Sequence, residues 1–436
     1  MPQTIFHADF EPRPYWWRFF APRPDLTHDL PAKTSVAIVG GGYTGLSAAL
    51  ALARHGIEAT VIEAEDFGYG ASTRNGGGVG GAVNVGKSLS GRRVDLAPGE
   101  REAIMAEASD AFDHIEAVAA RPDNGCEWNL NGRFIGAWTP RHYEDQKKSV
   151  ALLNGSAGLK VEMCPREEQH AHLNTDLYHG GMLVNRSATI NPALLYKGLL
   201  DRAIEANVRL CGKTRGTAMS RSGGSWTVTT ERGTVTADQV VVATNGYIDR
   251  AAPELRRRIV PIFSNIIVTE ELPEGLAEHI FPSGRYINDT LRIRSYYRLT
   301  PDGRRVLFGG RGRFGRSTPD QLARSLHDLM VERMPDLRGI KVAHAWSGLI
   351  AFTFDSMPHV GELDGVNFAL GCNGSGIAMM NYLGNYLGER IAGKASRKSA
   401  FERPIEGNAL YSGNPWFLPA IGGYYQVRDR LDRRLA

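Results

Sequence analysis

Arginines at alternating positions are the side chains of this sequence best suited to binding a substrate. Four polar side chains occupy every second position of a predicted strand over residues 291–300: Arg292, Arg294, Tyr296 and Arg298. Because successive side chains of a strand point to opposite faces, these four should share one face. Arg311 and Arg313 follow on the expected partner strand. Guanidinium groups pair with carboxylates, so the group suits an acidic substrate, although a solvated sheet edge would show the same pattern.

Other groups capable of chemistry are isolated. His344 and His359 could transfer protons, but a single histidine is more often structural. The four cysteines are scattered and form no C-x-x-C motif: Cys126, Cys164, Cys211 and Cys372. The sequence also has no G-x-S-x-G and no H-E-x-x-H motif. Hydrolase, metal and dithiol chemistry therefore have no support, and no metal site is predicted.

Residues 35–64 predict a nucleotide-binding unit. The apolar run 36–39 predicts a buried strand, and the Ala- and Leu-rich stretch 45–54 predicts the helix that follows it. Three glycines at this junction form a G-x-G-x-x-G motif: Gly40, Gly42 and Gly45. A second predicted strand, 59–62, ends at Glu63. A strand, a helix and an acid at this spacing are typical of a dinucleotide site, whereas the glycines alone could form a turn without a ligand.

Each residue of the motif has a physical role in this prediction. Gly40 permits the tight turn and Gly42 lets a pyrophosphate approach the backbone. Gly45 lets the helix pack closely on the strand, and the helix N-terminus offers N–H groups to phosphate. Glu63 can accept hydrogen bonds from a ribose. An acid at this position favours FAD or NAD over NADP.

Three later stretches could also meet a cofactor. The loop 67–81 is too rich in glycine for a helix and could approach something flat or anionic, with a mobile linker as the alternative. The predicted strand 238–243 runs into the turn 244–246 at the carboxyl end of the sheet. The turn 371–376 precedes a predicted helix, 377–391, whose N-terminus could stabilise a reduced flavin or could be an ordinary helix cap.

A second G-x-G-x-x-G, at 310–315, is not expected to bind a nucleotide. The residues that follow, Arg-Ser-Thr-Pro at 316–319, cannot open the small-residue helix that a phosphate needs. The lack of a second dinucleotide site argues against a flavin reductase driven by NAD(P)H.

The composition is that of an ordinary globular protein. The chain has 436 residues, of which 42% are hydrophobic and 22% charged, and its net charge is +4. This charge is too small to indicate nucleic acid binding, and no run of 18 apolar residues predicts a membrane-spanning helix. The N-terminus lacks the apolar core of a signal peptide, and the scattered cysteines suit a reducing compartment. A cytoplasmic location is therefore expected.

The order of the elements predicts an α/β (α+β overall) fold, with a discontinuous Rossmann-like FAD-binding domain and an inserted antiparallel β-sheet substrate domain. An arm at 1–30 is expected to pack on the surface, and 401–436 should form a charged tail. Four ranges are expected to make the FAD-binding domain: 31–90, 151–215, 238–250 and 340–400. Three ranges are expected to make the substrate domain: 91–150, 216–237 and 251–339.

Several stretches together resemble the D-amino-acid oxidase superfamily of FAD enzymes, and within it the gamma-glutamylputrescine oxidase-like enzymes. These stretches span nearly the whole chain: 37–49, 70–77, 243–247, 296–300, 346–348, 371–376 and the Tyr-Tyr-x-x-Arg-x-Arg pattern at 424–430. The resemblance implies oxidation of the carbon–nitrogen bond of an amine or amino acid. A hydride would pass from the carbon beside a neutral amine to flavin N5. The imine would hydrolyse, and oxygen would reoxidise the flavin to give hydrogen peroxide.

The resemblance also implies site residues. The expected cofactor contacts are Gly40, Gly42, Tyr43, Thr44, Gly45, Glu63, Ala64, Ser72, Thr73, Arg74, Asn75, Gly76, Gly77, Thr244, Asn245, Gly374, Ser375, Gly376 and Ile377. The expected catalytic residues are Arg294, Tyr296, Arg298, Arg311 and Trp346. Some relatives attach FAD through a cysteine, but the corresponding stretch 346–354 has none, so non-covalent FAD is expected.

Two alternatives to an amine oxidase stay open. One is an FAD-dependent dehydrogenase that passes electrons to an acceptor other than oxygen. The other is a flavin-binding protein without amine chemistry that serves a structural or electron-transfer role. The expected partners are a small amine or amino acid, with a carboxylate if the arginines bind it, and oxygen.

Overall fold

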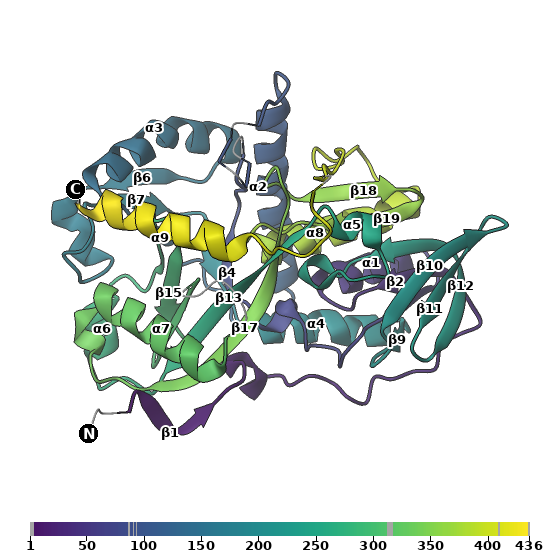
Figure 1. Ribbon diagram of the computed structural model, residues 1–436, viewed down its shortest axis with the longest axis horizontal. Coiled ribbons are helices and arrows are strands. Elements are labelled where there is room, and N and C mark those ends of the chain that lie inside the picture. Colours follow the sequence, from purple (N-terminus) through teal and green to yellow (C-terminus); the bar gives the residue numbers. More distant parts are fainter. Residues whose placement is uncertain are drawn as a thin grey trace.

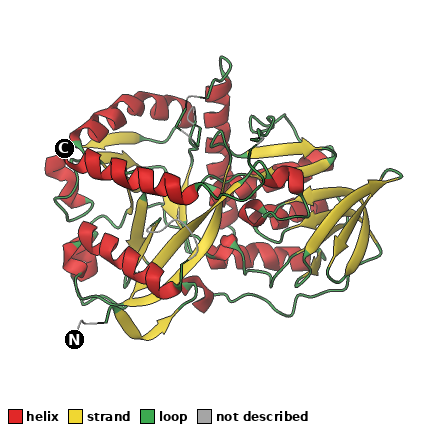
Figure 2. Cartoon of the chain, viewed as in Figure 1, coloured by secondary structure: helices red, strands yellow, loops and turns green. Residues whose placement is uncertain are grey.

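In a computed structural model the chain forms two large β-sheets with helices packed around them (Figures 1 and 2). The structure describes residues 4–85, 88–89, 91–92, 94–311, 317–408 and 410–434. One sheet has eight strands and the other has nine. A short pair, β4 (Gly78–Gly80) and β8 (Ser187–Thr189), forms a third sheet. The predicted mixed fold with a second, largely antiparallel sheet is confirmed.

The eight-stranded sheet contains the glycine motif. Its strands are β10 (Gly216–Ser222), β11 (Ser225–Thr230), β12 (Gly233–Val242), β2 (Lys33–Val39), β3 (Ala59–Ile62), β9 (Arg209–Cys211), β18 (His359–Leu363) and β19 (Val366–Leu370). β2 lies at the centre and pairs in parallel with β3 and β12. Its continuous apolar run is explained because helices or strands cover both of its faces.

The nine-stranded sheet carries the arginine-bearing strand. Its strands, in spatial order, are β1 (Phe6–Glu11), β17 (Val342–Phe352), β13 (Val260–Thr269), β16 (Val306–Gly310), β15 (Ser295–Leu299), β14 (Tyr286–Asp289), β5 (Arg133–Gly136), β7 (Gly181–Val184) and β6 (Val161–Cys164). The central strands β17, β13, β16, β15 and β14 pair antiparallel with one another, whereas β1 joins β17 and β5 joins β14 in parallel.

Strand pairing differs from the expected ranges in three places. Residues 216–237 form a hairpin that extends the eight-stranded sheet, because β12 continues into the strand beside β2. β6 and β7 fall within the expected FAD-binding range 151–215, yet they pair in the nine-stranded sheet. β17 also pairs there, although 340–400 was assigned to the FAD-binding domain. Alternation identifies a strand but does not say which sheet it joins.

Nine helices flank the sheets within the described residues (Figure 2). They are α1 (Tyr43–Arg54), α2 (Glu100–Ala119), α3 (Pro140–Ala157), α4 (Pro192–Glu205), α5 (Pro253–Arg256), α6 (Leu276–Ile280), α7 (Pro319–Arg333), α8 (Gly376–Ile391) and α9 (Leu418–Arg434). Five short 3-10 helices are η1 (Tyr15–Arg18), η2 (Ala71–Thr73), η3 (Arg166–Ala171), η4 (Asn245–Tyr247) and η5 (Pro335–Leu337).

Helices α1 and α8 pack with their backbones almost in contact. A Cβ added at Gly384 would overlap the backbone of Thr44, and one at Gly388 would lie 2.5 Å from the Cβ of Ala51. The hydroxyl of Ser47 also donates to the side-chain oxygen of Asn381 at 3.1 Å. This contact fixes the two helix N-termini relative to each other.

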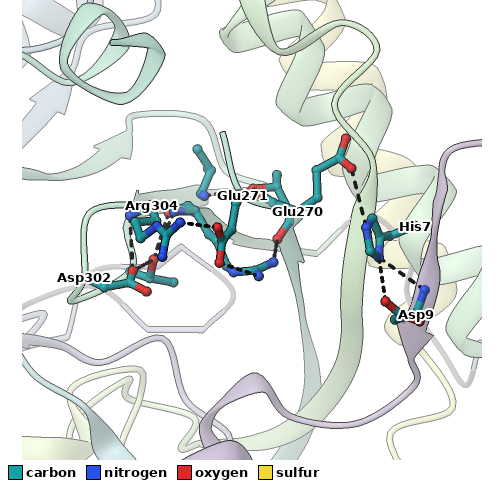
Figure 3. A network of polar contacts seen from close by, with 10 residues as sticks. His7, Asp9, Glu270, Glu271, Asp302 and Arg304 are labelled. Atoms are coloured by element: carbon teal, nitrogen blue, oxygen red, sulfur yellow. Dashed lines mark hydrogen bonds and ion pairs between the residues drawn. The ribbon is translucent and has the colours of Figure 1, made fainter. Parts of the chain in front are cut away.

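The N-terminal arm lies along one edge of the nine-stranded sheet and inserts some of its aromatic side chains. β1 pairs with β17, and Figure 3 shows His7 of β1 between Asp9 and Glu270 at this edge. Glu271, next in the chain, pairs with Arg304. In η1, which follows β1, Trp16 is completely buried. Tyr15 and Phe20 are buried as well, whereas Phe19 is 40% exposed, so the arm packs along the protein and inserts part of its aromatic side chains.

The C-terminal tail forms the long helix α9, drawn in yellow in Figure 1. Its Asp429 is only 4% exposed, and its carboxylate accepts the backbone N–H groups of Arg292 and Ile293 at 3.3 and 3.1 Å. The same carboxylate pairs with the Arg292 guanidinium, which also pairs with Asp432. The tail is therefore tied to the bend before β15.

A buried ion pair holds that bend from the other side. The Asp289 carboxylate accepts hydrogen bonds from Nε and Nη2 of Arg333 at 3.0 and 2.7 Å, and both side chains are almost fully buried. We expect Asp289→Asn to destabilise the fold by about 3 kcal/mol, because it removes the buried partner of Arg333 and leaves only the more exposed Glu332 to pair with it. The measurement is the denaturant midpoint. Asp336→Asn, an exposed carboxylate, should change it little, and an unchanged midpoint for Asp289→Asn would refute the argument.

Candidate active site

A cavity of about 1390 Å³ runs between the two sheets. It exceeds the roughly 300–1,000 Å³ of ordinary small-molecule pockets, so it can hold a dinucleotide together with a substrate. One end is lined by the turn after β2 and by the end of β3. The other end is lined by residues of β5, β14, β15 and α9.

The turn after β2 has the geometry expected for the glycine motif. Gly40 has φ of +111°, and a Cβ there would lie 2.8 Å from the carbonyl of Ala243. A Cβ at Gly45 would overlap the carbonyl oxygen of Gly40. Gly45 therefore allows helix and strand to approach and does not itself line the cavity, whereas Gly40 and Gly42 do.

Helix α1 begins at the cavity without an acidic residue in its first turn and without a side-chain hydrogen bond from its N-cap, Gly42. Tyr43 and Thr44 line the cavity there, and the Tyr43 N–H donates to the Ser72 hydroxyl at 3.0 Å. An uncapped helix N-terminus with glycine at its start attracts phosphate through its N–H groups and its dipole.

Glu63 lies at the end of β3, as predicted. Its carboxylate accepts the N–H of Gly41 at 2.8 Å and the N–H of Glu65 at 3.1 Å. Burial raises the pKa of Glu63 above its ordinary value, and the two N–H donors oppose that rise. Ala64 follows it along the cavity wall. A carboxylate held in this way can still accept the hydroxyl groups of a ribose, because each oxygen has two acceptor sites.

Side chains from three distant segments donate hydrogen bonds to backbone carbonyls of the glycine-rich loop after β3. The indole N–H of Trp346 donates to the Arg74 carbonyl at 2.8 Å, and that of Trp16 donates to the Asn75 carbonyl at 2.8 Å. The Arg298 guanidinium donates to the Gly77 carbonyl at 3.2 Å. The loop is therefore a fixed wall of the cavity, and the mobile-linker alternative is wrong for its described residues.

Glycines of this loop lie directly on aromatic rings. A Cβ at Gly76 would be 2.7 Å from the ring of Tyr296, and one at Gly78 would be 2.6 Å from the ring of Tyr286. The two tyrosine rings are nearly parallel, with centroids 6.2 Å apart. Part of the loop's glycine content is thus explained by flat protein side chains, in addition to any cofactor.

The third expected wall comes from η4 and the start of α8. Thr244, Asn245, Gly374, Ser375, Gly376 and Ile377 all line the cavity. The buried hydroxyl of Thr244 has no hydrogen-bond partner within the described chain, so a bound molecule with a polar atom would satisfy it. α8 also starts without an acid in its first turn and without a side-chain cap. These features fit a dinucleotide cofactor.

The substrate end of the cavity contains Arg294, Arg311 and Tyr296. The Tyr296 hydroxyl lies 3.1 Å from the Ser264 hydroxyl, and burial raises the pKa of Tyr296, so this phenol stays protonated. Arg311 lies 4.9 Å from the centroid of the Phe352 ring. Burial, with the nearby charge of Arg294, lowers the pKa of Arg311 to about 10, so it is still a cation at neutral pH.

Several predicted residues lie elsewhere. Arg298 and Trp346 do not line the cavity but donate to loop carbonyls, as described above. Arg292 and Arg294 line the cavity but precede β15, which starts only at Ser295, so the expected four-residue face does not form. Thr73 is buried behind the loop, where its hydroxyl accepts the indole N–H of Trp17 at 3.0 Å. Arg313 lies outside the described residues.

The two histidines have structural positions. His359 Nε2 lies 3.0 Å from the Asp355 carboxylate, and its Nδ1 faces the Arg403 carbonyl. Burial lowers the pKa of His344 to about 4, so it is neutral at physiological pH. Neither side chain lines the cavity. Within the described chain no cluster of His, Cys, Asp and Glu could hold a metal ion.

Sequence reasoning missed a second group of cavity residues. Arg133 and Ile135 of β5, Tyr286 and Asn288 of β14, and Tyr425 of α9 all line the cavity. In β5 and β14 these residues occupy every second position. Strands of four residues are too short for this alternation to be recognised in the sequence.

Comparison with known proteins agrees with this geometry. The family model for FAD dependent oxidoreductases matches residues 35–390, which include the cavity-lining strands of both sheets but not α9. The chain belongs to this family. Its cofactor is FAD, and it is an FAD-dependent oxidoreductase. The chain is 32% identical to gamma-glutamylputrescine oxidoreductase of Escherichia coli (strain K12) over 410 residues, which cover 91% of this chain and 93% of that protein.

One further curated relative and one solved structure are also similar to the chain. The probable oxidoreductase OrdL of Rhizobium meliloti (strain 1021) is 30% identical over 433 residues, or 95% of this chain and 97% of that protein. The crystal structure of glycine oxidase from Geobacillus kaustophilus has a TM-score of 0.69 at 19% identity, covering 88% of this chain and 99% of that one. The latter shares the fold of this FAD-dependent oxidoreductase. None of the helices described here combines the length and apolar character that crossing a membrane requires.

The carboxylate of Glu63 provides a test of the FAD site. We expect Glu63→Ala to raise the dissociation constant of FAD about 10- to 100-fold, because one or two hydrogen bonds to a charged group contribute about 1.5–3 kcal/mol. Titration of the apoprotein, followed by quenching of flavin fluorescence, measures this constant. Glu58→Ala, which removes an exposed carboxylate before β3, is the control. Equal affinities of the Glu63 variant and the wild type would contradict the assignment.

Proposed function

We propose that this oxidoreductase oxidises the carbon–nitrogen bond of an amine or amino acid that carries a carboxylate. The amine loses one hydrogen from carbon and one from nitrogen to become an imine, and oxygen gains both as hydrogen peroxide. Water then converts the imine to a carbonyl compound and a released amine. Non-covalent FAD supplies the two-electron acceptor.

The observation that carries this proposal is the pair of arginines at the substrate end. Arg294 and Arg311 line the cavity, and no described carboxylate forms an ion pair with either. Arg294 is exposed and Arg311 is half-buried, so an anionic substrate that lies against both cations would supply the partner that they lack. The relative from Escherichia coli is named for gamma-glutamylputrescine, which supports an amine as the reacting group.

The chain's own residues would bind and orient the substrate. The two guanidinium groups would hold its carboxylate through paired hydrogen bonds. The protonated Tyr296 hydroxyl could donate to a polar atom of the substrate, since Ser264 occupies only one side of it. The rings of Tyr296 and Tyr286 and the loop at Gly76 would exclude water from the reacting carbon.

Oxygen use can be tested directly. A panel of amines, N-methyl amino acids, D-amino acids and polyamine conjugates is mixed with the enzyme without air, and loss of flavin absorbance identifies substrates. For a substrate in air, we expect hydrogen peroxide in a one-to-one ratio with the oxidised product. Flavin reduction without peroxide would instead show a dehydrogenase. No flavin reduction by any compound would favour a flavin-binding protein without amine chemistry.

The arginine pair gives a second prediction. Arg311→Met should raise the KM for a carboxylate-bearing amine at least tenfold and change kcat less than threefold, because the lost bond holds substrate and transition state alike. An amine without a carboxylate should be unaffected. Steady-state kinetics with both amines measures the difference, and Arg304→Met, an exposed arginine paired with Glu271, is the control. If Arg311→Met raises the KM of both amines equally, Arg311 does not bind the carboxylate.

A further inference from the structure

A third arginine, Arg133 of β5, lies on the cavity wall beyond the proposed carboxylate site. It stands opposite Tyr286 in the parallel pairing of β5 with β14, and its guanidinium lies 5.0 Å from the centroid of that ring. A Cβ at Gly80 would lie 3.3 Å from its Nη2. The ring and the glycine backbone therefore fix where the guanidinium points.

The polar atoms around Arg133 lack protein partners. Its Nε is buried without a hydrogen-bond partner, and so is the side-chain oxygen of Asn288 on the neighbouring strand. No described carboxylate forms an ion pair with Arg133. The acids that line the cavity lie at its other end, where Glu63 binds the N–H of Gly41 and where Glu65 and Asp249 pair with Arg215.

Arg133, Arg294 and Arg311 line the same cavity, and we call them the arginine row. Arg294 is close enough to lower the pKa of both Arg133 and Arg311, although burial is the larger cause in each case. A substrate with one carboxylate would compensate only part of this charge. A substrate with two carboxylates would meet the row with two anions, one near Arg311 and one near Arg133.

Beyond Arg133 the wall is apolar. Ile135, Leu153, Leu159, Met182 and Val184 line this part of the cavity. Met182 and Val184 lie on β7, opposite Ile135 and Arg133. This surface suits the methylene groups that connect two charged ends, because apolar walls bind hydrocarbon and leave the orientation to the few polar groups.

We propose that Arg133 binds a second anionic group of the substrate, which makes the substrate class an amine with two carboxylates. This inference rests on the proposed function for the identity of the reacting bond. It concerns a residue for which the kinetic tests above give no information.

Dicarboxylate binding tests the inference without any turnover. The FAD-loaded enzyme is titrated with succinate, glutarate and adipate, and with butyrate, pentanoate and hexanoate as monocarboxylates of the same lengths. Calorimetry and the flavin absorbance change both report binding. We expect at least one dicarboxylate to bind ten or more times as tightly as the monocarboxylate of equal length. Arg133→Met should abolish this preference while it changes the monocarboxylate constant less than twofold.

Two further variants make the test decisive. Arg285→Met removes another half-buried arginine, which neighbours Tyr286 in the chain but does not line the cavity, and it should keep the preference. Arg133→Lys keeps the positive charge but lacks the paired N–H donors of the guanidinium, so it should give an intermediate preference for dicarboxylates. This variant also tests the inference if Arg133→Met does not fold. Equal binding of both ligand series by the wild type would overturn the inference, and so would equal weakening of both by Arg133→Met. Absence of amine oxidation with the preference intact would refute the proposed function alone.

Discussion

The arrangement of the cavity depends on the backbone carbonyls of one loop. Those of Arg74, Asn75 and Gly77 each accept a hydrogen bond from a different part of the chain: β17, the N-terminal arm and β15. The loop lies where the two sheets meet, and its N–H and C=O groups would be costly to bury without partners. These three donors therefore fix both the cofactor wall and the surface on which Tyr296 lies.

Local sequence was sufficient for the nucleotide end of the site. Gly40, Gly45 and Glu63 lie within 24 residues of one another, and their roles follow from turn geometry and helix packing. The loop anchors could not be predicted in the same way. The indole N–H groups of Trp16 and Trp346 donate to backbone carbonyls 59 and 272 residues away. Contacts between residues so far apart produce no periodic pattern in the sequence.

The errors at the substrate end have a related cause. Alternation over 291–300 suggested one strand, but Asp429 of α9 holds the backbone of Arg292 and Ile293 in a bend, so the strand starts at Ser295. A contact from the last helix thus sets where the strand begins. The cavity-lining carboxylates Glu63, Glu65 and Asp249 also lie at the nucleotide end, whereas the substrate end has arginines and no lining acid among the described residues. That separation became visible only when β5 and β14 were placed beside β15.

The central position of β2 has a consequence for the order of events during synthesis. β2 pairs with β3, which follows within 30 residues, but its other neighbour is β12, which ends at Val242. The helix that packs on α1 begins only at Gly376, and the clamp on the bend before β15 waits for Asp429. The early glycine motif thus leaves the ribosome long before β12 and α8 exist. A nascent chain of this protein must keep an unfinished parallel sheet from aggregating until almost its last residues have emerged.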